Sequence, residues 1–416
     1  MLSKIKLIDI ATVLFLSYVL VGSTSSDHMY IALLLFASWI AFAILNSGRN
    51  LIRALTDKKV SLLLFYLTYA FLSGLFVGPI EFLLKQFFSG ILLFSPIIVF
   101  NYYNEGKNIS RLKTIVIILV VWWGVTSIRA LSFYNQYEEA ARDLASDTSL
   151  YGDIAIGGGY GLAFGSAILV SFSILYYSYL IQKKRYRFII WFAFLLLTIM
   201  VVFQTMSTTT FVAMVIGIIG SLMLYKTRTT SDVAIRMFLL LVIGVILYLS
   251  MDSLLLMMSN YFSNQEGIMF SRLDSLTGMI AGDSSTGYYS SSRTQIPFDA
   301  LKTFFKHPIF GVSYMHGNYY LNPRLYGVGN HCEWSDALAN YGIIGGIPML
   351  LIYINQCKSI FKNIGYSSFG LLLCVFILGF FNPFRTFQSH LVLFFIIPAI
   401  MEISRKPNST ISDNIK

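Results

Sequence analysis

Apolar runs of bilayer-spanning length recur along almost the whole of this 416-residue chain. A membrane-spanning helix needs about 20 consecutive apolar residues, and hydropathy with length predicts about twelve such spans here. They begin near Leu7, Met29, Val60, Phe87, Leu112, Ile156, Phe188, Thr208, Val233, Cys332, Tyr366 and Thr386. We therefore expect an all-α polytopic membrane protein. Helices one to nine fall in residues 1–258, helices ten to twelve in 332–404, and a tail in 405–416.

Two polar intervals interrupt this pattern. The shorter one runs from about Leu131 to Ala155 and leads into a glycine run, and the longer one covers residues 259–331, between the ninth and tenth predicted helices. A connection this long is usually functional or disordered. Its tyrosine, phenylalanine and leucine content argues against disorder, so we expect it to carry function.

A short amphipathic helix is predicted inside the long loop, from Pro297 to Lys306. Proline suits a first helical turn, and Phe298, Leu301, Phe304 and Phe305 fall near one face. The following His307-Pro308 step stops the helix, because the residue before a proline resists helical geometry. We expect this helix to lie on the membrane surface or under a substrate cavity.

The basic residues are divided unequally between the two sides of the predicted membrane. With the N-terminus in the cytoplasm, 21 of the 30 lysine and arginine residues lie in inner loops or tails. The outer side keeps Lys85, Arg129, Arg142, Arg272, Arg293, Lys302, Lys306, Arg324 and Arg385. This asymmetry follows the positive-inside rule, so we expect both termini to be cytoplasmic and the long loop to be outside. The net charge of +10 then reflects topology and predicts no nucleic-acid partner.

Composition agrees with a membrane protein, since 56% of residues are hydrophobic and only 12% are charged. The first apolar run has no small-residue cleavage site, and we expect it to be the first span and not a signal peptide. Cys332, Cys357 and Cys374 lie at different predicted depths and are not expected to form disulfides. No cysteine and histidine spacing suggests zinc, so no metal is expected.

Arg293 and His331 are the strongest candidates for chemistry in the outer loop. An arginine matches phosphate oxygens with two donors and stays charged, although a loop arginine also commonly pairs with a carboxylate such as Asp283 or Asp299. His331 comes just before a predicted helix, whose dipole disfavours the protonated ring and leaves it able to accept a proton. A histidine at such a boundary is also often structural, so both roles stay open.

Other residues of the outer side are candidates for substrate binding. The arginines that any anionic ligand could use are Arg272, Arg324, Arg129 and Arg385. Glu333, like Asp336, would either orient His331 or cap the helix that follows. Tyr319 and Tyr320 lie in a stretch rich in tyrosine and asparagine, which suits either sugar binding or an interfacial aromatic belt. The glycines of the Tyr341–Gly346 segment indicate close helix packing.

The order of these residues resembles a known group. An outward Arg293 is followed by the turn His307-Pro308-Ile309-Phe310-Gly311, then by His331, and then by Gly342 and Gly345 in a new span. Together with the late outer loop, this pattern resembles the O-antigen polymerase and O-antigen ligase superfamily of bacterial surface-polysaccharide enzymes. The motif covers only the Arg293–Gly346 stretch, and the rest of the chain matches by hydropathy alone.

The resemblance implies a GT-C-like fold in the bacterial inner membrane with a periplasmic active site. It implies inverting, metal-independent glycosyl transfer from undecaprenyl diphosphate-linked oligosaccharide, without a cofactor. Arg293 would hold the diphosphate, His331 would be the catalytic base, and Pro308, Gly311, Gly342 and Gly345 would be structural. Many members also open a central span with a serine–arginine pair, whereas this chain has Ser207-Thr208-Thr209-Thr210 there. The second cationic contact is therefore open.

Three functions fit this picture. The first is an O-antigen polymerase, which joins a growing lipid-linked glycan to a new lipid-linked repeat unit and has a chain-length regulator protein as a candidate partner. The second is a ligase with lipid A–core as its acceptor, which shares the same motif. The third is a flippase for the same lipid-linked unit. Transporters commonly have internal repeats and charged residues at mid-membrane, and the sequence shows neither feature clearly, which disfavours this function.

Overall fold

The long apolar runs of the chain fold as α-helices, as expected where backbone polar groups must be satisfied within one segment. The computed structural model describes residues 6–21, 26–75, 79–136, 159–181, 185–205, 207–225, 229, 231–236, 238–239, 242, 290–313, 328 and 332–404. No strand occurs within those ranges. The helical class predicted from hydropathy is confirmed there.

Helices begin close to most of the predicted span starts that are described, but α4 begins at Ile80, well before the predicted Phe87. The N-terminal part of the chain contains α1 (Leu7–Val21), α2 (Ser26–Leu55), α3 (Lys58–Gly74), α4 (Ile80–Glu105) and α5 (Ile109–Gln136). The central part contains α7 (Tyr160–Ile181), α8 (Arg185–Gln204) and α9 (Thr208–Met223). The C-terminal part contains α13 (Ser290–Lys306), α14 (Glu333–Ile364), the turn η3 (Gly365–Ser368), α15 (Phe369–Phe381), α16 (Phe387–Leu391), η4 (Val392–Ile396) and α17 (Ile397–Ser404).

Membrane-spanning character is visible in the lengths and compositions of these helices. Five segments of the described chain are long and apolar enough to cross a bilayer: Met29–Leu55, Ile80–Glu105, Ile109–Tyr134, Glu333–Phe381 and Phe387–Ser404. Shorter apolar helices occupy Leu7–Val21, Tyr160–Leu175, Ile189–Gln204 and Thr209–Met223. The chain is therefore a polytopic membrane protein. The number of about twelve spans stays a prediction, and most of the ninth, from Val233, lies outside the described residues.

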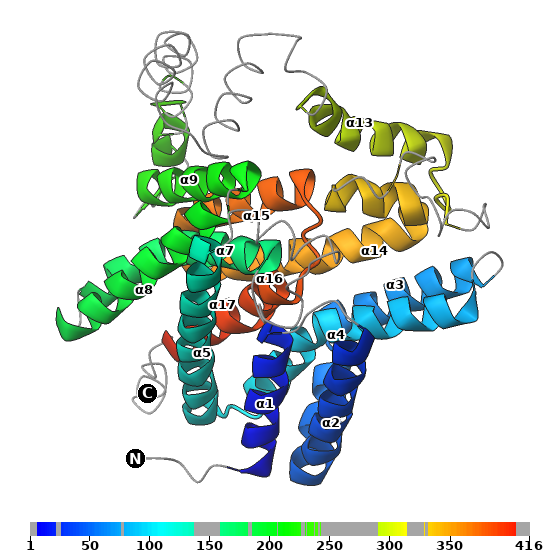
Figure 1. Cartoon of the computed structure of the whole chain (residues 1–416), viewed down its shortest axis with the longest axis horizontal. Helices are drawn as coiled ribbons and strands as arrows, with labels where there is room; N and C mark the ends of the chain where they lie inside the picture. The colour runs from blue at the N-terminus through cyan, green and yellow to red at the C-terminus, as the bar shows by residue number, and fades with distance from the viewer. Residues whose placement is uncertain are drawn as a thin grey trace, which may run out of the picture.

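The last span forms the centre of the molecule. Every side chain from Gln388 to Ile400 is buried, and this segment runs through α16, the π-helical turn η4 and α17. Its neighbours include α4, where residues 92–103 are all buried, and α7. Figure 1 shows α16 and α17 enclosed by the other helices. A helix that is apolar on all sides and surrounded by protein contributes to the core along its whole length.

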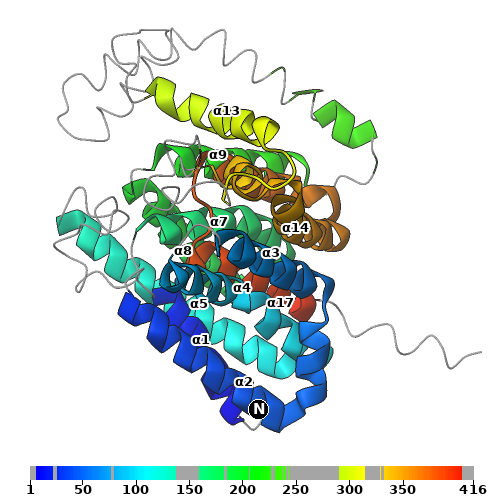
Figure 2. The same ribbon diagram turned by 90° about the vertical axis from the view of Figure 1, so that its right-hand side faces the viewer.

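The two ends of the molecule differ in chemistry. In Figures 1 and 2, α13 lies on the far side of the molecule from α1 and α2. At the α1 end, Lys6 Nζ lies 2.9 Å from Asn46 Oδ1, and Lys59 Nζ, at the start of α3, lies 3.0 Å from Gln356 Oε1. Lys6 and Lys59, both assigned to inner loops or tails, thus contact neutral amide side chains, while the orientation of the helices in the membrane stays a prediction.

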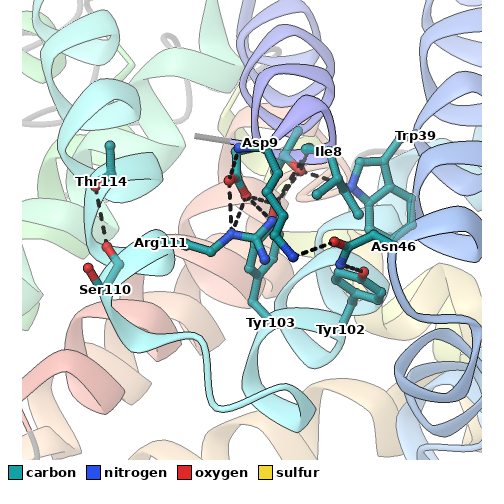
Figure 3. A network of polar contacts seen from close by, with 11 residues as sticks. Ile8, Asp9, Trp39, Asn46, Tyr102, Tyr103, Ser110, Arg111 and Thr114 are labelled. Atoms are coloured by element: carbon teal, nitrogen blue, oxygen red, sulfur yellow. Dashed lines mark hydrogen bonds and ion pairs between the residues drawn. The ribbon is translucent and has the colours of Figure 1, made fainter. Parts of the chain in front are cut away.

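A buried ion pair fastens α1 to α5 at this end (Figure 3). Arg111 Nε donates to both carboxylate oxygens of Asp9, at 2.9 and 2.8 Å, and each side chain is only 10% exposed. The Tyr103 hydroxyl donates to Asp9 Oδ1 at 2.8 Å, and the Arg111 guanidinium lies 5.5 Å from the Tyr103 ring centre. Thr12 Oγ1 lies 2.8 Å from the same hydroxyl and accepts from Trp39 Nε1 at 2.9 Å. The network therefore joins α1, α2, α4 and α5.

Removing one partner of this pair should be costly, because it leaves the other charge buried and unpaired. We expect Asp9→Ala or Arg111→Ala to lower the free energy of unfolding by about 3 kcal/mol. The matched control is Arg53→Ala, which breaks an exposed 3.8 Å pair with Glu105 and should cost less than about 1 kcal/mol. Unfolding of the purified protein in mixed micelles measures both. Equal costs for the buried and exposed pairs would contradict this account.

Candidate functional site

The candidate site lies where α13 meets α14, at the opposite end from Asp9. The helix α13 ends at Lys306, as the His307-Pro308 step predicts, but it begins at Ser290. The prediction that Pro297 opens the helix is therefore wrong, since α13 continues through this proline. A proline inside a helix removes one hydrogen bond, and the tertiary setting here outweighs that local preference.

The apolar residues of α13 occupy two faces and not the single face that was predicted. Ala300 and Phe304 point inward and pack in a small cluster with Val312, Val328, Cys332 and Ala339. Phe298 and Phe305 point outward, with 58% and 73% of their surfaces exposed. Residues four apart share a helix face, whereas Phe304 and Phe305 differ by about 100° around the axis, so adjacent phenylalanines separate.

The helix α14 is broken at Gly342. Its backbone angles there, φ 58° and ψ −160°, are not helical. A Cβ at Gly346 would lie 2.8 Å from the Ala337 carbonyl oxygen, although nine residues of straight helix would separate these positions by about 13 Å. The segment Glu333–Tyr341 therefore folds back against the start of the second part. The tenth span, predicted to run unbroken from Cys332, instead consists of a short half-helix and a long helix.

Four backbone groups at this break find their hydrogen-bond partners in the turn after α13. A continuous helix would join Ile343 N–H to the Ala339 carbonyl and Ile344 N–H to the Asn340 carbonyl. Instead, Ile343 N donates to Pro308 O at 2.8 Å and Ile344 N to Ile309 O at 3.3 Å. The Ala339 and Asn340 carbonyls accept from Val312 N at 3.0 Å and Ser313 N at 3.1 Å. We call these four hydrogen bonds the backbone clasp.

Glycine is required on both sides of the backbone clasp. Gly311 has φ 74°, and a Cβ there would overlap the Asn340 carbonyl. Gly342 has a positive φ as well, and a Cβ there would overlap the Ile309 carbonyl. Gly345 packs against the Tyr69 and Tyr341 side chains, and its contact with Tyr69 of α3 agrees with the predicted close helix packing. Gly342 does not serve the predicted helix packing. It ends the first half of α14 and allows the backbone of Ile309 to approach closely.

A buried carboxylate and an arginine meet beside the backbone clasp. Arg385 Nε lies 2.7 Å from Glu333 Oε1, and the Glu333 side chain is 2% exposed while that of Arg385 is 33% exposed. Arg385 Nη1 donates to the Tyr66 hydroxyl at 2.8 Å, and the Tyr66 ring packs edge-on against Tyr341. Glu333 N donates to the Asn382 carbonyl at 3.3 Å. Thus α3, α14 and the 382–386 connection hold one guanidinium whose outer part remains accessible.

A buried histidine supports this connection from inside. His390 Nδ1 lies 2.9 Å from the Thr386 carbonyl, which can only accept, so Nδ1 carries the proton. His390 Nε2 then accepts from the Tyr353 hydroxyl at 2.7 Å. The Tyr353 ring packs on Trp334, the neighbour of Glu333, with ring centres 4.8 Å apart. The contacts of His390 and Tyr353 therefore support both segments that carry the Glu333–Arg385 pair, namely the start of α14 and the 382–386 connection.

The start of α14 is capped by an acid of its own first turn. Asp336 Oδ2 accepts from Cys332 N at 3.4 Å, and Ser335 Oγ donates to Cys332 Sγ at 2.9 Å. Burial raises the pKa of the Cys332 thiol to about 12, and Asp336 adds to this rise. Of the two roles considered for the acids, Asp336 takes the capping role and Glu333 pairs with Arg385. His331 directly precedes this capped helix start.

The structure reaches only part of the predicted site. His331, Arg272, Arg324, Tyr319 and Tyr320 lie outside the described residues. The backbone of Arg293 belongs to α13, but its side chain is outside the described part. Arg129 is exposed on α5. Among the described histidine, cysteine, aspartate and glutamate side chains, no group of three or more could hold a metal ion.

Sequence reasoning proposed Glu333 and Arg385 separately and did not foresee their contact. It also missed Tyr66, Tyr353 and His390 as their support. The partners of Arg385 lie 52 residues away at Glu333 and 319 residues away at Tyr66, so no local pattern connects them. The one available signal was Arg385 just before the last span, followed closely by His390 at the start of that span.

Comparison with known proteins supports the resemblance drawn from the motif. Residues 192–350 match a family model described as O-antigen ligase. The matched region contains α13, the turn that follows it, the break in α14 and Glu333. No curated protein matches the chain.

Two glycines with similar backbone angles allow the backbone clasp to be tested separately from glycine's conformational freedom. Gly365 has φ 72° and ψ −153°, but nothing lies within 4 Å of its Cβ position. We expect Gly365→Ala to cost about 1–3 kcal/mol from backbone strain alone. Gly342→Ala should cost more than about 4 kcal/mol, because it also displaces the 308–311 backbone. Thermal unfolding in detergent compares the two, and similar midpoints would argue against the backbone clasp.

Proposed function

We propose, from the match of residues 192–350 to a family model described as O-antigen ligase, that this protein is an O-antigen polymerase. The family supports polymerase or ligase activity on a lipid-linked oligosaccharide. In our proposal a growing glycan leaves undecaprenyl diphosphate and joins a new undecaprenyl diphosphate-linked repeat unit. The reaction takes place at the periplasmic face of the inner membrane, with both chain termini in the cytoplasm.

The observation that carries this proposal is the backbone clasp. The motif elements that suggested the superfamily are the turn ending at Gly311 and the glycines from Gly342, and these form one hydrogen-bonded unit. The unit lies within the matched region and joins the helix of Arg293 to the helix that follows His331. Motif residues from two separate segments thus form one unit, and this supports our proposal that Arg293 and His331 act at one site.

The chemistry needs a base for the acceptor and positive charge for the leaving group. The acceptor sugar hydroxyl attacks the anomeric carbon, the bond from that carbon to the diphosphate oxygen breaks, and configuration inverts. His331 accepts the hydroxyl proton, and the start of α14 favours the neutral ring that this role requires. The electron pair of the broken bond stays on the diphosphate, where Arg293 stabilises the developing charge.

Arg385 is the best supported second cation among the described arginines. Arg129 is exposed on α5 and has no comparable support, whereas Arg385 is oriented by Glu333 and Tyr66 near the start of α14. Only part of its surface is accessible, and Glu333 offsets part of its charge. Arg385 therefore suits a fixed donor of hydrogen bonds to one diphosphate oxygen, beside the principal charge of Arg293.

Glu333 has a second consequence for the site. Its carboxylate holds Arg385 in place, so the guanidinium loses little conformational freedom when a ligand binds. The same carboxylate disfavours any anion that does not reach Arg385 directly, which suits a site for one diphosphate and not for a polyanion. The charge of the outer loop and helix start supports this reading, since residues 259–336 contain five basic and six acidic residues and so have no excess of positive charge for a polyanion.

The ligase function is the second candidate, because the matching family model carries that description. A ligase and a polymerase would share the donor, the diphosphate site and the base. They differ in the acceptor, which is lipid A–core for the ligase. Our preference for a polymerase rests on the tyrosine- and asparagine-rich sequence of residues 311–329, which suits contacts with repeated sugar units.

Reconstitution distinguishes these functions. Purified protein in liposomes with synthetic undecaprenyl diphosphate-linked repeat unit should produce longer lipid-linked glycans, seen as a ladder by gel or mass spectrometry. A chelator should not slow the reaction, because the cations are arginines. Extension only when lipid A–core is added would identify a ligase, and transfer of the donor across the bilayer without new bonds would identify a flippase. A chelator-sensitive reaction would contradict the arginine-only mechanism.

Variants test the residue roles. We expect Arg293→Ala and His331→Ala to abolish long-chain polymer at unchanged protein level, each with a loss of at least about 100-fold. Arg53→Ala, at the far end of the molecule, is the matched arginine control and should give normal chains.

A double variant separates support from substrate contact at Arg385. Arg385→Gln alone leaves Glu333 buried without its cation, so it should lower both stability and activity. Adding Glu333→Gln should restore protein level. If Arg385 contacts the diphosphate, the double variant stays inactive, whereas recovery of polymer would assign Arg385 a purely structural role.

A further inference from the structure

The outward face of α13 is apolar and flanked by lysines. Counting about 100° per residue, Phe298, Leu301 and Phe305 lie on one side of the helix, with Lys302 and Lys306 along its edge. Phe305 is the more exposed of the two outward phenylalanines, and the Lys302 side chain is 74% exposed. Such a face is unfavourable in water and is typical of a helix at a membrane interface.

This face is presented in a fixed orientation. The opposite side of α13 is held by the packing of Ala300 and Phe304 against Val312, Cys332 and Ala339. The backbone clasp then fastens the following turn to α14, and Tyr69 donates to the Phe310 carbonyl at 2.9 Å. Turning the outward phenylalanines of α13 inward would therefore break both sets of contacts.

The apolar surface continues from α13 onto the spans below it. Ile309 and Phe310 are exposed in the turn, and the backbone clasp sets this turn directly against Ile343 and Ile344. From there, the exposed side chains of α14 follow one stripe: Ile343, Ile347, Ile354 and Phe361. These positions return to the same side of the helix at intervals of about 3.6 residues, so they share one face. A continuous apolar stripe on a spanning helix faces lipid.

We infer that α13 lies in the headgroup region of an anionic bilayer leaflet, with its outward face against the lipid. Phe298, Phe305 and Phe310 enter the boundary between headgroups and acyl chains, about 5–10 Å deep. Lys302 and Lys306 extend their stems along this surface and place their charges at lipid phosphates. Lys302 also pairs with Asp299 at 3.1 Å, an exposed contact that lipid phosphate can replace.

This placement deepens the proposed function, on which the following consequence rests. The backbone of Arg293 belongs to the same helix, so a helix lying along the membrane holds Arg293 at headgroup depth. The diphosphate of a lipid-linked donor lies at that depth, because its polyprenyl chain remains in the bilayer. The membrane contact of α13 would then hold Arg293 at the same depth in the bilayer as the diphosphate of the donor.

Depth-dependent quenching tests the inference in the full chain. Of the three cysteines, Cys332 and Cys374 are buried, so Cys357→Ser provides the background for labelling. A fluorophore is attached at Phe305→Cys, or at Phe298→Cys if the first variant fails to fold. Ile354→Cys on the α14 stripe is the lipid-facing reference, and Thr56→Cys in the α2–α3 turn is the solvent-facing reference. The proteins are placed in nanodiscs whose lipids carry a nitroxide near the glycerol or near the tail end.

We expect the label on α13 to be quenched more by the shallow nitroxide than by the deep one, and well above the Thr56 reference. Raising the phosphatidylglycerol content should increase this quenching, and Lys302→Gln with Lys306→Gln should remove that increase. A label quenched no more than the Thr56 reference would overturn the inference, whether water or another protein covers the face. Quenching unaffected by lipid charge would overturn the lysine contact.

Discussion

The backbone clasp between the turn after α13 and the break in α14 is the contact on which the candidate site depends. Two carbonyls and two N–H groups at this break lack the partners that a continuous helix would give them, and leaving them unsatisfied would cost more than any single side-chain contact here provides. The turn satisfies all four, at Ala339, Asn340, Ile343 and Ile344. Each segment therefore depends on the other, because the broken helix and the turn each supply backbone hydrogen-bond partners that the other lacks. The motif glycines are the residues that permit this approach.

The backbone clasp also explains how a surface helix can serve a site in a membrane protein. It fixes the end of α13 relative to α14, and the fold-back of Glu333–Tyr341 brings the start of α14 to the Arg385 segment. The last span, buried along its length, then supports that segment through His390, which contacts Tyr353 of α14. Groups that we propose to approach a ligand at the surface are thus anchored in the most enclosed part of the molecule. This arrangement restricts their motion, as a site built on fixed donors requires.

The sequence predicted what depends on local pattern and missed what depends on distant contacts. Helix positions, the end of α13 at the His307-Pro308 step and the glycine-dependent region near Gly342 follow from hydropathy and backbone chemistry. The start of α13 and the opposite directions of Phe304 and Phe305 do not, because the cluster around Ala339 decides them. The break at Gly342 looked like helix packing, since glycine serves both purposes and only the partner turn distinguishes them. The Glu333–Arg385 pair joins residues too far apart in sequence for any spacing rule.

The two buried arginine–carboxylate pairs at opposite ends of the molecule differ in a way that bears on function. Asp9 and Arg111 are equally enclosed, each 10% exposed, and a tyrosine, a backbone N–H and several neighbouring helices complete their surroundings. In the second pair the carboxylate is 2% exposed and the arginine 33% exposed, so the anion is enclosed and the cation reaches the surface. A pair that only fastened helices would gain nothing from this asymmetry, because exposure weakens the attraction. An accessible guanidinium held by a hidden carboxylate is instead suited to meeting an anion from outside, which is why Arg385 and not Arg111 belongs with the candidate site.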